Sequence, residues 1–186
     1  GRRLAIEGQG TKSALGRPVV ADAVLSLAGL SAVTLYEPDE MVVTVRAGTP
    51  LAIVQRELAL HGQCLAFEPS GLETFLGVTG REATIGGTMA AGMAGPRRFA
   101  AGAARDHLLG FTAVDGEGQV FRAGGKVVKN VTGYDLPKLA AGSFGTLFVM
   151  TEITLRTLPM PVATRYVAIE GQPADRKSTR LNSSHT

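Results

Sequence analysis

Hydrophobic residues alternate with polar ones along much of the chain, and this spacing predicts β-strands. Over residues 41–47, Val43 and Val45 alternate with Thr44 and Arg46, a period of two that is typical of a half-buried strand. Short apolar runs predict further strands at residues 4–6, 24–27, 32–36, 63–67, 108–114, 119–122, 147–155 and 164–169. In the run at 147–155, the alternation puts Val149, Ile153 and Leu155 on one face and Met150 on the other.

A different spacing, of three and four residues, predicts one clear helix at residues 50–61. Thr49 is suited to cap its N-terminus, Pro50 to occupy its first position, and Gly62 to follow its last turn. The apolar stripe of this helix consists of Leu51, Ile53, Val54 and Leu58. A shorter helix is predicted at residues 135–141.

Composition and charge argue against a nucleic-acid partner. The net charge is +3, but Arg176, Lys177 and Arg180 against Asp175 contribute +2 of it within the last twelve residues. Trp is absent and aromatic residues make up 5% of the chain, so the stacking surface of a single-strand binder is lacking. We therefore expect no basic surface for nucleic acid.

The cysteine count and the apolar runs indicate a compartment. Cys64 is the only cysteine, which excludes a disulfide within the chain and a multi-cysteine metal site. A reducing, cytoplasmic location fits best. No apolar run approaches the ~18 residues of a membrane span, so we expect no direct span. With a single cysteine, we also expect no bound metal.

Two glycine-rich segments carry the candidate chemistry. Residues 8–13, Gly-Gln-Gly-Thr-Lys-Ser, follow a predicted strand, and the glycines allow successive N–H groups to converge on an anion. A plain glycine turn is the alternative. Residues 84–87, Thr-Ile-Gly-Gly, precede a run of small residues that lets a flat ligand approach the backbone, at a helix N-terminus that would favour negative charge. Tight helix packing is the alternative there.

Other polar residues give weaker signals. His61 is expected at a helix C-terminus, where a cation is favoured, and His107 beside Arg105-Asp106 as a charge partner rather than a catalytic group. Arg97 and Arg98 lie in a glycine-rich setting that makes contact with a phosphate or carboxylate plausible.

Taken in order, the motifs resemble the FAD-binding domain of the p-cresol methylhydroxylase and vanillyl-alcohol oxidase type. The segments that carry this resemblance are 7–13, 37–39, 84–87, 105–106, 129–136, 142–146 and 151–153. Within that superfamily, residues 15–18, 95–98 and 129–136 are most similar to FAD-binding subunits of bacterial glycolate oxidases.

The resemblance implies an α+β fold with two subdomains, about 1–68 and 80–158, the second built on a mostly antiparallel sheet, with FAD between them. It assigns the diphosphate to Gly8, Gln9, Gly10, Thr11 and Lys12. Approach to the diphosphate and flavin is assigned to Gly80, Ala83, Thr84, Gly86, Gly87 and Ala91, and backbone contact to Gly145, Thr146 and Met150. The first loop lacks the His or Cys that attaches flavin in some relatives, so non-covalent FAD is expected.

The resemblance also implies oxidation of a small 2-hydroxy acid, glycolate to glyoxylate, beside a second flavin subunit and an iron–sulfur subunit. Such a complex is expected in the cytoplasm or, through its partners, at the inner face of the cytoplasmic membrane. The alternatives are a non-catalytic electron-relay subunit and a dehydrogenase of the D-lactate type that works as one polypeptide without partners.

The chain ends are expected to limit what this fragment does. The domain is expected to span residues 1–160, with the natural N-terminus missing, and residues 161–174 to begin a truncated substrate domain. Residues 175–186 resemble a translated sequencing adapter and are treated as non-native. Because this superfamily draws its carboxylate-binding and base residues largely from the substrate domain, no catalytic residue is assigned and the fragment alone is expected to be inactive.

Overall fold

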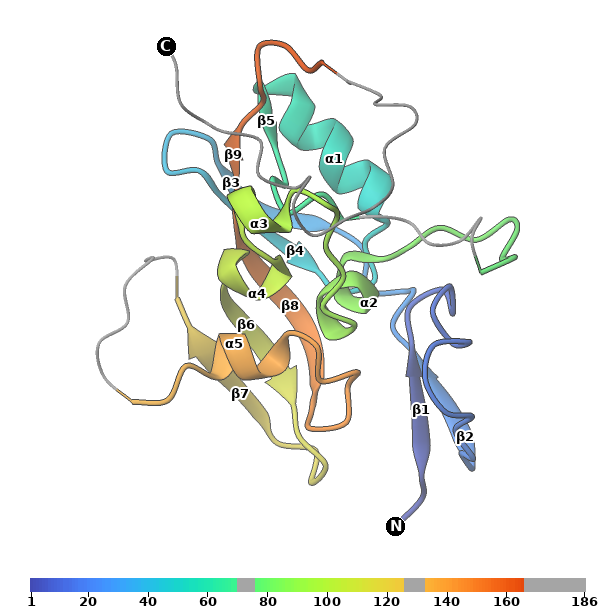
Figure 1. Ribbon diagram of the computed structural model, residues 1–186. Helices are drawn as coiled ribbons and strands as arrows, with labels where there is room; N and C mark the ends of the chain where they lie inside the picture. Colours follow the sequence, from blue (N-terminus) through green and yellow to red (C-terminus); the bar gives the residue numbers. More distant parts are fainter. Residues whose placement is uncertain (70–75, 126–132, 166–186) are drawn as a thin grey trace, which may run out of the picture.

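A five-stranded antiparallel sheet runs through the centre of the molecule (Figure 1). The computed structural model describes residues 1–69, 76–125 and 133–165. The sheet has the strand order β3-β4-β8-β6-β7. Its members are β3 (Val33–Glu37), β4 (Val42–Arg46), β6 (Leu108–Val114), β7 (Val120–Gly124) and β8 (Val149–Arg156).

The two expected subdomains share this sheet. Strands β3 and β4 come from the first half of the chain, and β4 pairs along its whole length with β8, for example Val43 opposite Leu155. Strands β6 and β7, both predicted from the sequence, form a hairpin on the other side of β8, with Val114 opposite Val120. The sheet therefore ties the halves together, while the division into two subdomains stays a prediction.

The pattern of buried and exposed side chains in β4 and β8 differs from the prediction. Strand β4 is buried from Val42 to Val45, not half-buried. Val43 and Val45 lie in the core, and Thr44 on the other face is 8% exposed, with its hydroxyl paired to that of Thr154 at 3.0 Å. Strand β8 has a register shift against β6, where Thr112 faces Glu152 and Ala113 faces Met150. This bulge buries Met150 together with Ile153, although simple alternation puts them on opposite faces.

The predicted helix is present as α1 (Leu51–Leu60), with two differences at its start and on its surface. Pro50, not Thr49, is the N-cap, because the Thr49 hydroxyl exchanges hydrogen bonds with the backbone of Ala32 at 3.0 and 3.2 Å. Leu51, Val54 and Leu58 are buried as predicted, whereas Ile53 is 45% exposed.

Within the described residues, four short helices accompany α1. They are α2 (Ile85–Ala90), α3 (Arg98–Ala101), α4 (Ala104–His107) and α5 (Leu136–Ala140). Asp135 caps α5 by accepting a hydrogen bond from the N–H of Lys138 at 3.2 Å. The predicted helix at residues 135–141 is thus confirmed.

Two small sheets flank the main one. Strands β1 (Leu4–Glu7) and β2 (Ala23–Ser26) pair in parallel, and β5 (Gln63–Cys64) and β9 (Leu158–Pro159) pair antiparallel. The strand predicted at 63–67 is shorter, because the chain turns after Leu65 and buries Phe67.

The core lies where α1 and α2 meet the sheet. It is made of side chains from α1, α2, α4, α5, β4, β6, β8 and neighbouring loops, including Val43, Val45, Val54, Leu58, Phe67, Ile85, Met89, Ile153 and Leu155. These helices and an antiparallel sheet make an α+β fold, as predicted. Most of the strand predicted at 164–169, part of the motif at 129–136 and the tail at 175–186 lie outside the described residues.

Candidate functional site

The two glycine-rich segments lie against each other in the structure. Residues 8–13 follow β1, and Thr84 is the N-cap of α2. A Cβ atom built on Gly8 would overlap the Thr84 hydroxyl oxygen and lie 2.9 Å from its Cγ2. Contact this close is possible only because residue 8 has no side chain.

A cavity of about 350 Å³ opens at this junction. It is bounded by β1, the first glycine loop, α2 and the segment 144–146. Ten predicted residues line it: Gly8, Gln9, Gly10, Thr11, Lys12, Thr84, Gly87, Ala91, Gly145 and Thr146. An adjoining hollow of about 50 Å³ shares part of this wall and adds Gly86 and Met150.

Two predicted residues line neither hollow. Gly80 lies in an exposed turn with a φ of +71°. Ala83 is buried in the core, where its carbonyl oxygen accepts a hydrogen bond from the N–H of Leu51 at 2.8 Å. The Ala83 backbone therefore anchors the start of α1 and does not line the cavity.

The first loop offers a run of unsatisfied donors. Within the described residues, the N–H groups of Gly8, Gln9, Gly10 and Thr11 donate to no protein acceptor. The Thr11 side chain is buried, and its hydroxyl accepts a hydrogen bond from Lys12 Nζ at 3.3 Å. Successive N–H groups beside a lysine suit a diphosphate, since backbone donors and positive charge both stabilise an anion.

The start of α2 has a different role from the one expected. Its first three N–H groups are satisfied by protein: Ile85 donates to Thr49 O at 2.9 Å, Gly86 to Ala47 O at 2.8 Å and Gly87 to Thr84 Oγ1 at 3.2 Å. This terminus therefore has no free donor for an anion. A Cβ on Gly86 would lie 2.6 Å from the Ala47 carbonyl oxygen, so glycine allows the helix to pack here.

The third wall comes from the segment before β8. Phe144 donates its N–H to the carbonyl of Ala90 at 2.8 Å, which fixes this segment to α2. The Phe144 side chain is half exposed and lines both hollows with Ile6, while Phe148 lines the smaller one. The sequence patterns did not single out these apolar residues. The signal that could have identified them is their position in the sequence, close to the glycines of the predicted site.

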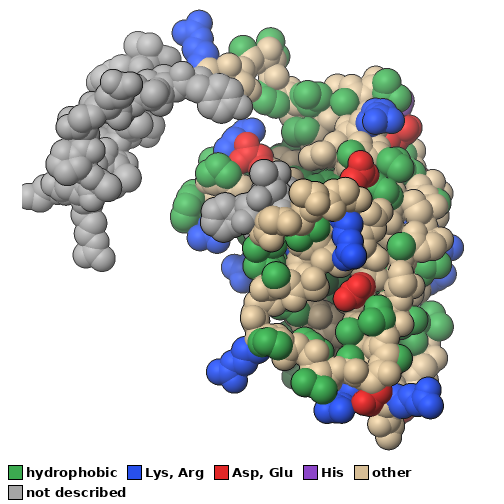
Figure 2. Space-filling model, turned by 90° about the vertical axis from the view of Figure 1, so that its right-hand side faces the viewer, with side chains coloured by type: hydrophobic (Ala, Val, Ile, Leu, Met, Phe, Trp, Pro, Cys, Tyr) green, Lys and Arg blue, Asp and Glu red, His purple; other side chains and the backbone are tan. Residues whose placement is uncertain are grey.

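The face of the molecule in Figure 2 mixes side chains of every kind. Basic and acidic side chains are interspersed among hydrophobic ones, and the described residues form no broad basic patch on it. No helix in the described part of the chain has the length and apolar character needed to cross a membrane. Nor do three His, Cys, Asp or Glu side chains of the described residues come together as a metal site would require.

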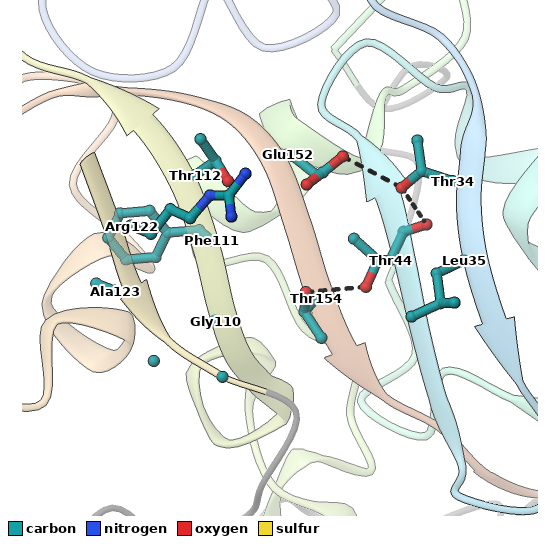
Figure 3. Close-up of a pocket in the computed structure, with 12 residues that line it drawn as sticks. Thr34, Leu35, Thr44, Gly110, Phe111, Thr112, Arg122, Ala123, Glu152 and Thr154 are labelled. Carbon is teal, nitrogen blue, oxygen red and sulfur yellow. Dashed lines mark hydrogen bonds between the residues drawn. The ribbon is translucent and has the colours of Figure 1, made fainter. Parts of the chain in front are cut away.

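A second hollow, of about 390 Å³, lies on the surface of the main sheet (Figure 3). No residue of the predicted site lines it. Many of its polar groups bond to one another across the strands: Thr34 to Glu152 at 3.2 Å and Thr44 to Thr154 at 3.0 Å. Glu152 also pairs with Arg46 at 3.6 Å. The arrangement is a hydrogen-bonded sheet surface, and the cofactor candidate remains the junction of the glycine loops.

The histidines and the arginine pair have structural surroundings. His107 is fully buried, with Nε2 2.7 Å from the Ala101 carbonyl and its ring packed on Phe67, so it does not form the charge contact expected with Arg105-Asp106. His61 follows α1 as expected. Arg97 pairs with Glu68 at 4.0 Å, and the Arg98 guanidinium lies 5.0 Å from the centre of the Phe99 ring.

The profile of the family described as "FAD binding domain" matches residues 1–124. The chain belongs to this family. The match confirms the resemblance to the p-cresol methylhydroxylase and vanillyl-alcohol oxidase type and makes FAD the cofactor of the domain. The residues fit FAD, since the first loop, whose N–H groups at 8–11 donate to no acceptor among the described residues, lines the cavity together with small residues of α2.

Relatives of known name include glycolate oxidase subunit GlcE of Escherichia coli, 44% identical over 160 residues, which cover 86% of this chain and 43% of the relative. D-lactate dehydrogenase of Anaerostipes hadrus is 31% identical over 138 residues, covering 74% of this chain and 27% of the relative. D-2-hydroxyglutarate dehydrogenase of Xanthomonas citri is 32% identical over 162 residues, covering 85% and 32%. The chain thus spans less than half the length of these relatives.

A solved structure shows the same fold. Alkyldihydroxyacetonephosphate synthase superposes with a TM-score of 0.68 at 21% identity, over 87% of this chain and 28% of that one. At this identity the likeness concerns the fold alone, and it agrees with the α+β architecture described above.

Proposed function

We propose that this chain is the FAD-binding domain of a flavoprotein oxidoreductase that oxidises a small 2-hydroxy acid, with glycolate as the substrate and glyoxylate as the product. The observation that carries the proposal is the run of four unsatisfied N–H groups at residues 8–11 beside a wall of small side chains. The substrate class is supported by the names of the relatives: glycolate, D-lactate and D-2-hydroxyglutarate all carry a hydroxyl next to a carboxylate.

The first loop would hold the diphosphate of FAD. Its N–H groups donate to no acceptor among the described residues, so few hydrogen bonds within the protein oppose binding of the diphosphate. Lys12 adds positive charge at the same end of the cavity.

Small residues and two aromatic rings would surround the flat ring of the flavin. Gly87, Ala90 and Ala91 have at most a methyl side chain, so a planar group could lie close to the backbone of α2. Phe144 and Phe148 supply apolar surface at the other wall, where they exclude water.

When bound, the flavin accepts a hydride from the carbon that carries the substrate hydroxyl. This reaction also needs a cation for the carboxylate and a base for the hydroxyl proton. Among the described residues that line the cavity, the charged side chains are Glu7 and Lys12, both at the first glycine loop where we place the diphosphate, and there is no histidine or arginine. The role of this domain is therefore to bind, orient and shield the cofactor, and we assign the substrate-binding groups to the rest of the protein.

The partners follow from the same similarity. We assign the chain to a complex with a second flavin subunit, since it is also 30% identical to glycolate oxidase subunit GlcD of Bacillus subtilis over 155 residues. An iron–sulfur subunit would carry the electrons onward. The complex is placed in the cytoplasm, or at the inner face of the cytoplasmic membrane through its partners.

An electron-relay subunit without its own substrate is the second candidate. The observation that favours it is again the lack of histidine and arginine among the described lining residues. The third candidate is a dehydrogenase of the D-lactate type that works as one polypeptide without partners, favoured by the likeness to D-lactate dehydrogenase.

The deciding experiment is anaerobic reduction of the intact protein, purified with and without its partner subunits. Glycolate should bleach the visible absorption of its flavin, and acetate, which lacks the hydroxyl, should not. Bleaching by glycolate that occurs only when the partner subunits are present would favour the electron-relay subunit. Bleaching by D-lactate but not by glycolate would replace the substrate, and no bleaching by any 2-hydroxy acid would refute the proposed class.

A further inference from the structure

We propose that Arg81 is a positioning residue that orients the first glycine loop for the diphosphate. The proposal rests on the proposed FAD-binding role and adds a residue that neither glycine motif contains. Arg81 lies in the segment that leads to α2, far along the chain from the loop it contacts.

Arg81 and its neighbour hold Gln9 by two hydrogen bonds. The Arg81 guanidinium donates from Nη1 to the Gln9 carbonyl oxygen at 3.4 Å. The N–H of Glu82 donates to Gln9 Oε1 at 3.1 Å. The backbone and the side chain of one loop residue are thus fastened to the same short segment.

The backbone bond has a consequence for the next N–H group. The Gln9 carbonyl belongs to the same peptide unit as the N–H of Gly10, and in a trans peptide these two groups point in opposite directions. The described residues contain no cis peptide. Because Arg81 holds the carbonyl on one side, the Gly10 N–H points to the opposite side, where no group of the described residues accepts it.

Gly10 makes room for this contact. A Cβ on residue 10 would lie 2.8 Å from Arg81 Nη1 and 3.2 Å from Glu7 Oε2. The guanidinium therefore occupies the space that a side chain would take, and any larger residue would displace it.

Arg81 acts through the loop and not as a direct ligand of the diphosphate. Its side chain is exposed, it does not line the cavity, and its Nη1 donates to the Gln9 carbonyl. A positioning role of this kind lowers the cost of ordering the loop on binding. It predicts weaker FAD binding without Arg81, with the salt dependence of binding retained.

The test uses the intact protein after removal of its flavin. The dissociation constants of FAD and of riboflavin, which lacks the diphosphate, are measured by flavin fluorescence at low and at high sodium chloride. Arg81→Ala should weaken FAD binding by about tenfold, the effect of losing one hydrogen bond to a guanidinium, and leave riboflavin binding unchanged. Arg81→Lys, which still donates to Gln9, should recover most of the loss.

Arg56→Ala is the matched control, since it removes the same charge from the exposed surface of α1. Wild-type affinity in Arg81→Ala would overturn the proposal. So would a loss of salt dependence, which marks a direct charge contact, or an equal loss for riboflavin, which marks a general collapse of the site. Failure of the wild-type protein to bind FAD would instead refute the proposed function.

Discussion

Gly8 lies against the side chain of Thr84, close enough that a Cβ atom on residue 8 would overlap the Thr84 hydroxyl oxygen. The same hydroxyl accepts the N–H of Gly87 at 3.2 Å and so caps α2. One hydroxyl therefore contacts the first glycine loop and caps α2. The loop and the helix form two walls of the cofactor cavity.

Gly8→Ala should weaken FAD binding by at least about tenfold. The added methyl group must displace either the loop or the Thr84 cap, and loss of a cap alone costs about 1 kcal/mol. Flavin fluorescence titration of the intact protein gives the affinity. Gly29→Ala is the control, since a Cβ there meets no heavy atom within 4 Å. Equal affinity in both variants would show that the Gly8 contact is not needed for the cofactor.

Gly10→Val should lose most FAD affinity while the protein stays folded. Gly10 has a φ of +67°, where a branched side chain costs about 1–3 kcal/mol, so the loop would move to a different conformation. Circular dichroism checks the fold and fluorescence titration the affinity. Gly116→Val serves as the comparison, because its Cβ meets nothing and its φ is not positive. If Gly10→Val folds and binds FAD like the parent, the diphosphate does not lie at this loop.

Local patterns predicted most of the elements because their causes are local. The spacing of Leu51, Val54 and Leu58 predicts the buried face of α1. The first glycine segment falls at a turn and the second at the start of a helix, as expected. The resemblance placed Gly8 and Thr84 at one ligand, and they are in contact.

The differences have non-local causes. Thr49 does not cap α1 because Ala32, from the connection before β3, takes its hydroxyl. Met150 changes face because of a bulge against β6. The contact of Arg81 with Gln9 joins two loops and has no periodic signal in the sequence. Ala83 lies in the core and does not line the cavity, because its carbonyl pairs with the N–H of Leu51.

The intact protein should release its flavin on denaturation with acid. The described residues that line the cavity include no His or Cys, the residue types expected to form a covalent bond to flavin. After precipitation, the yellow colour should stay in the supernatant. Flavin that remains in the washed pellet would contradict the non-covalent assignment.

Cys64 should react slowly with iodoacetamide at neutral pH. Burial raises the pKa of its thiol above the ordinary 9.0, and Glu68 adds to this while Arg97 opposes it. Because the thiolate is the reactive form, a raised pKa lowers the reactive fraction at every pH below that value. The alkylation rate, followed by mass spectrometry of the Cys64 peptide, should therefore keep rising as the pH passes 9. Arg97→Gln should slow the reaction further, since it removes the positive charge that opposes the shift. The denatured protein provides the reference, and equal rates for folded and denatured protein near neutral pH would show that burial does not protect this thiol.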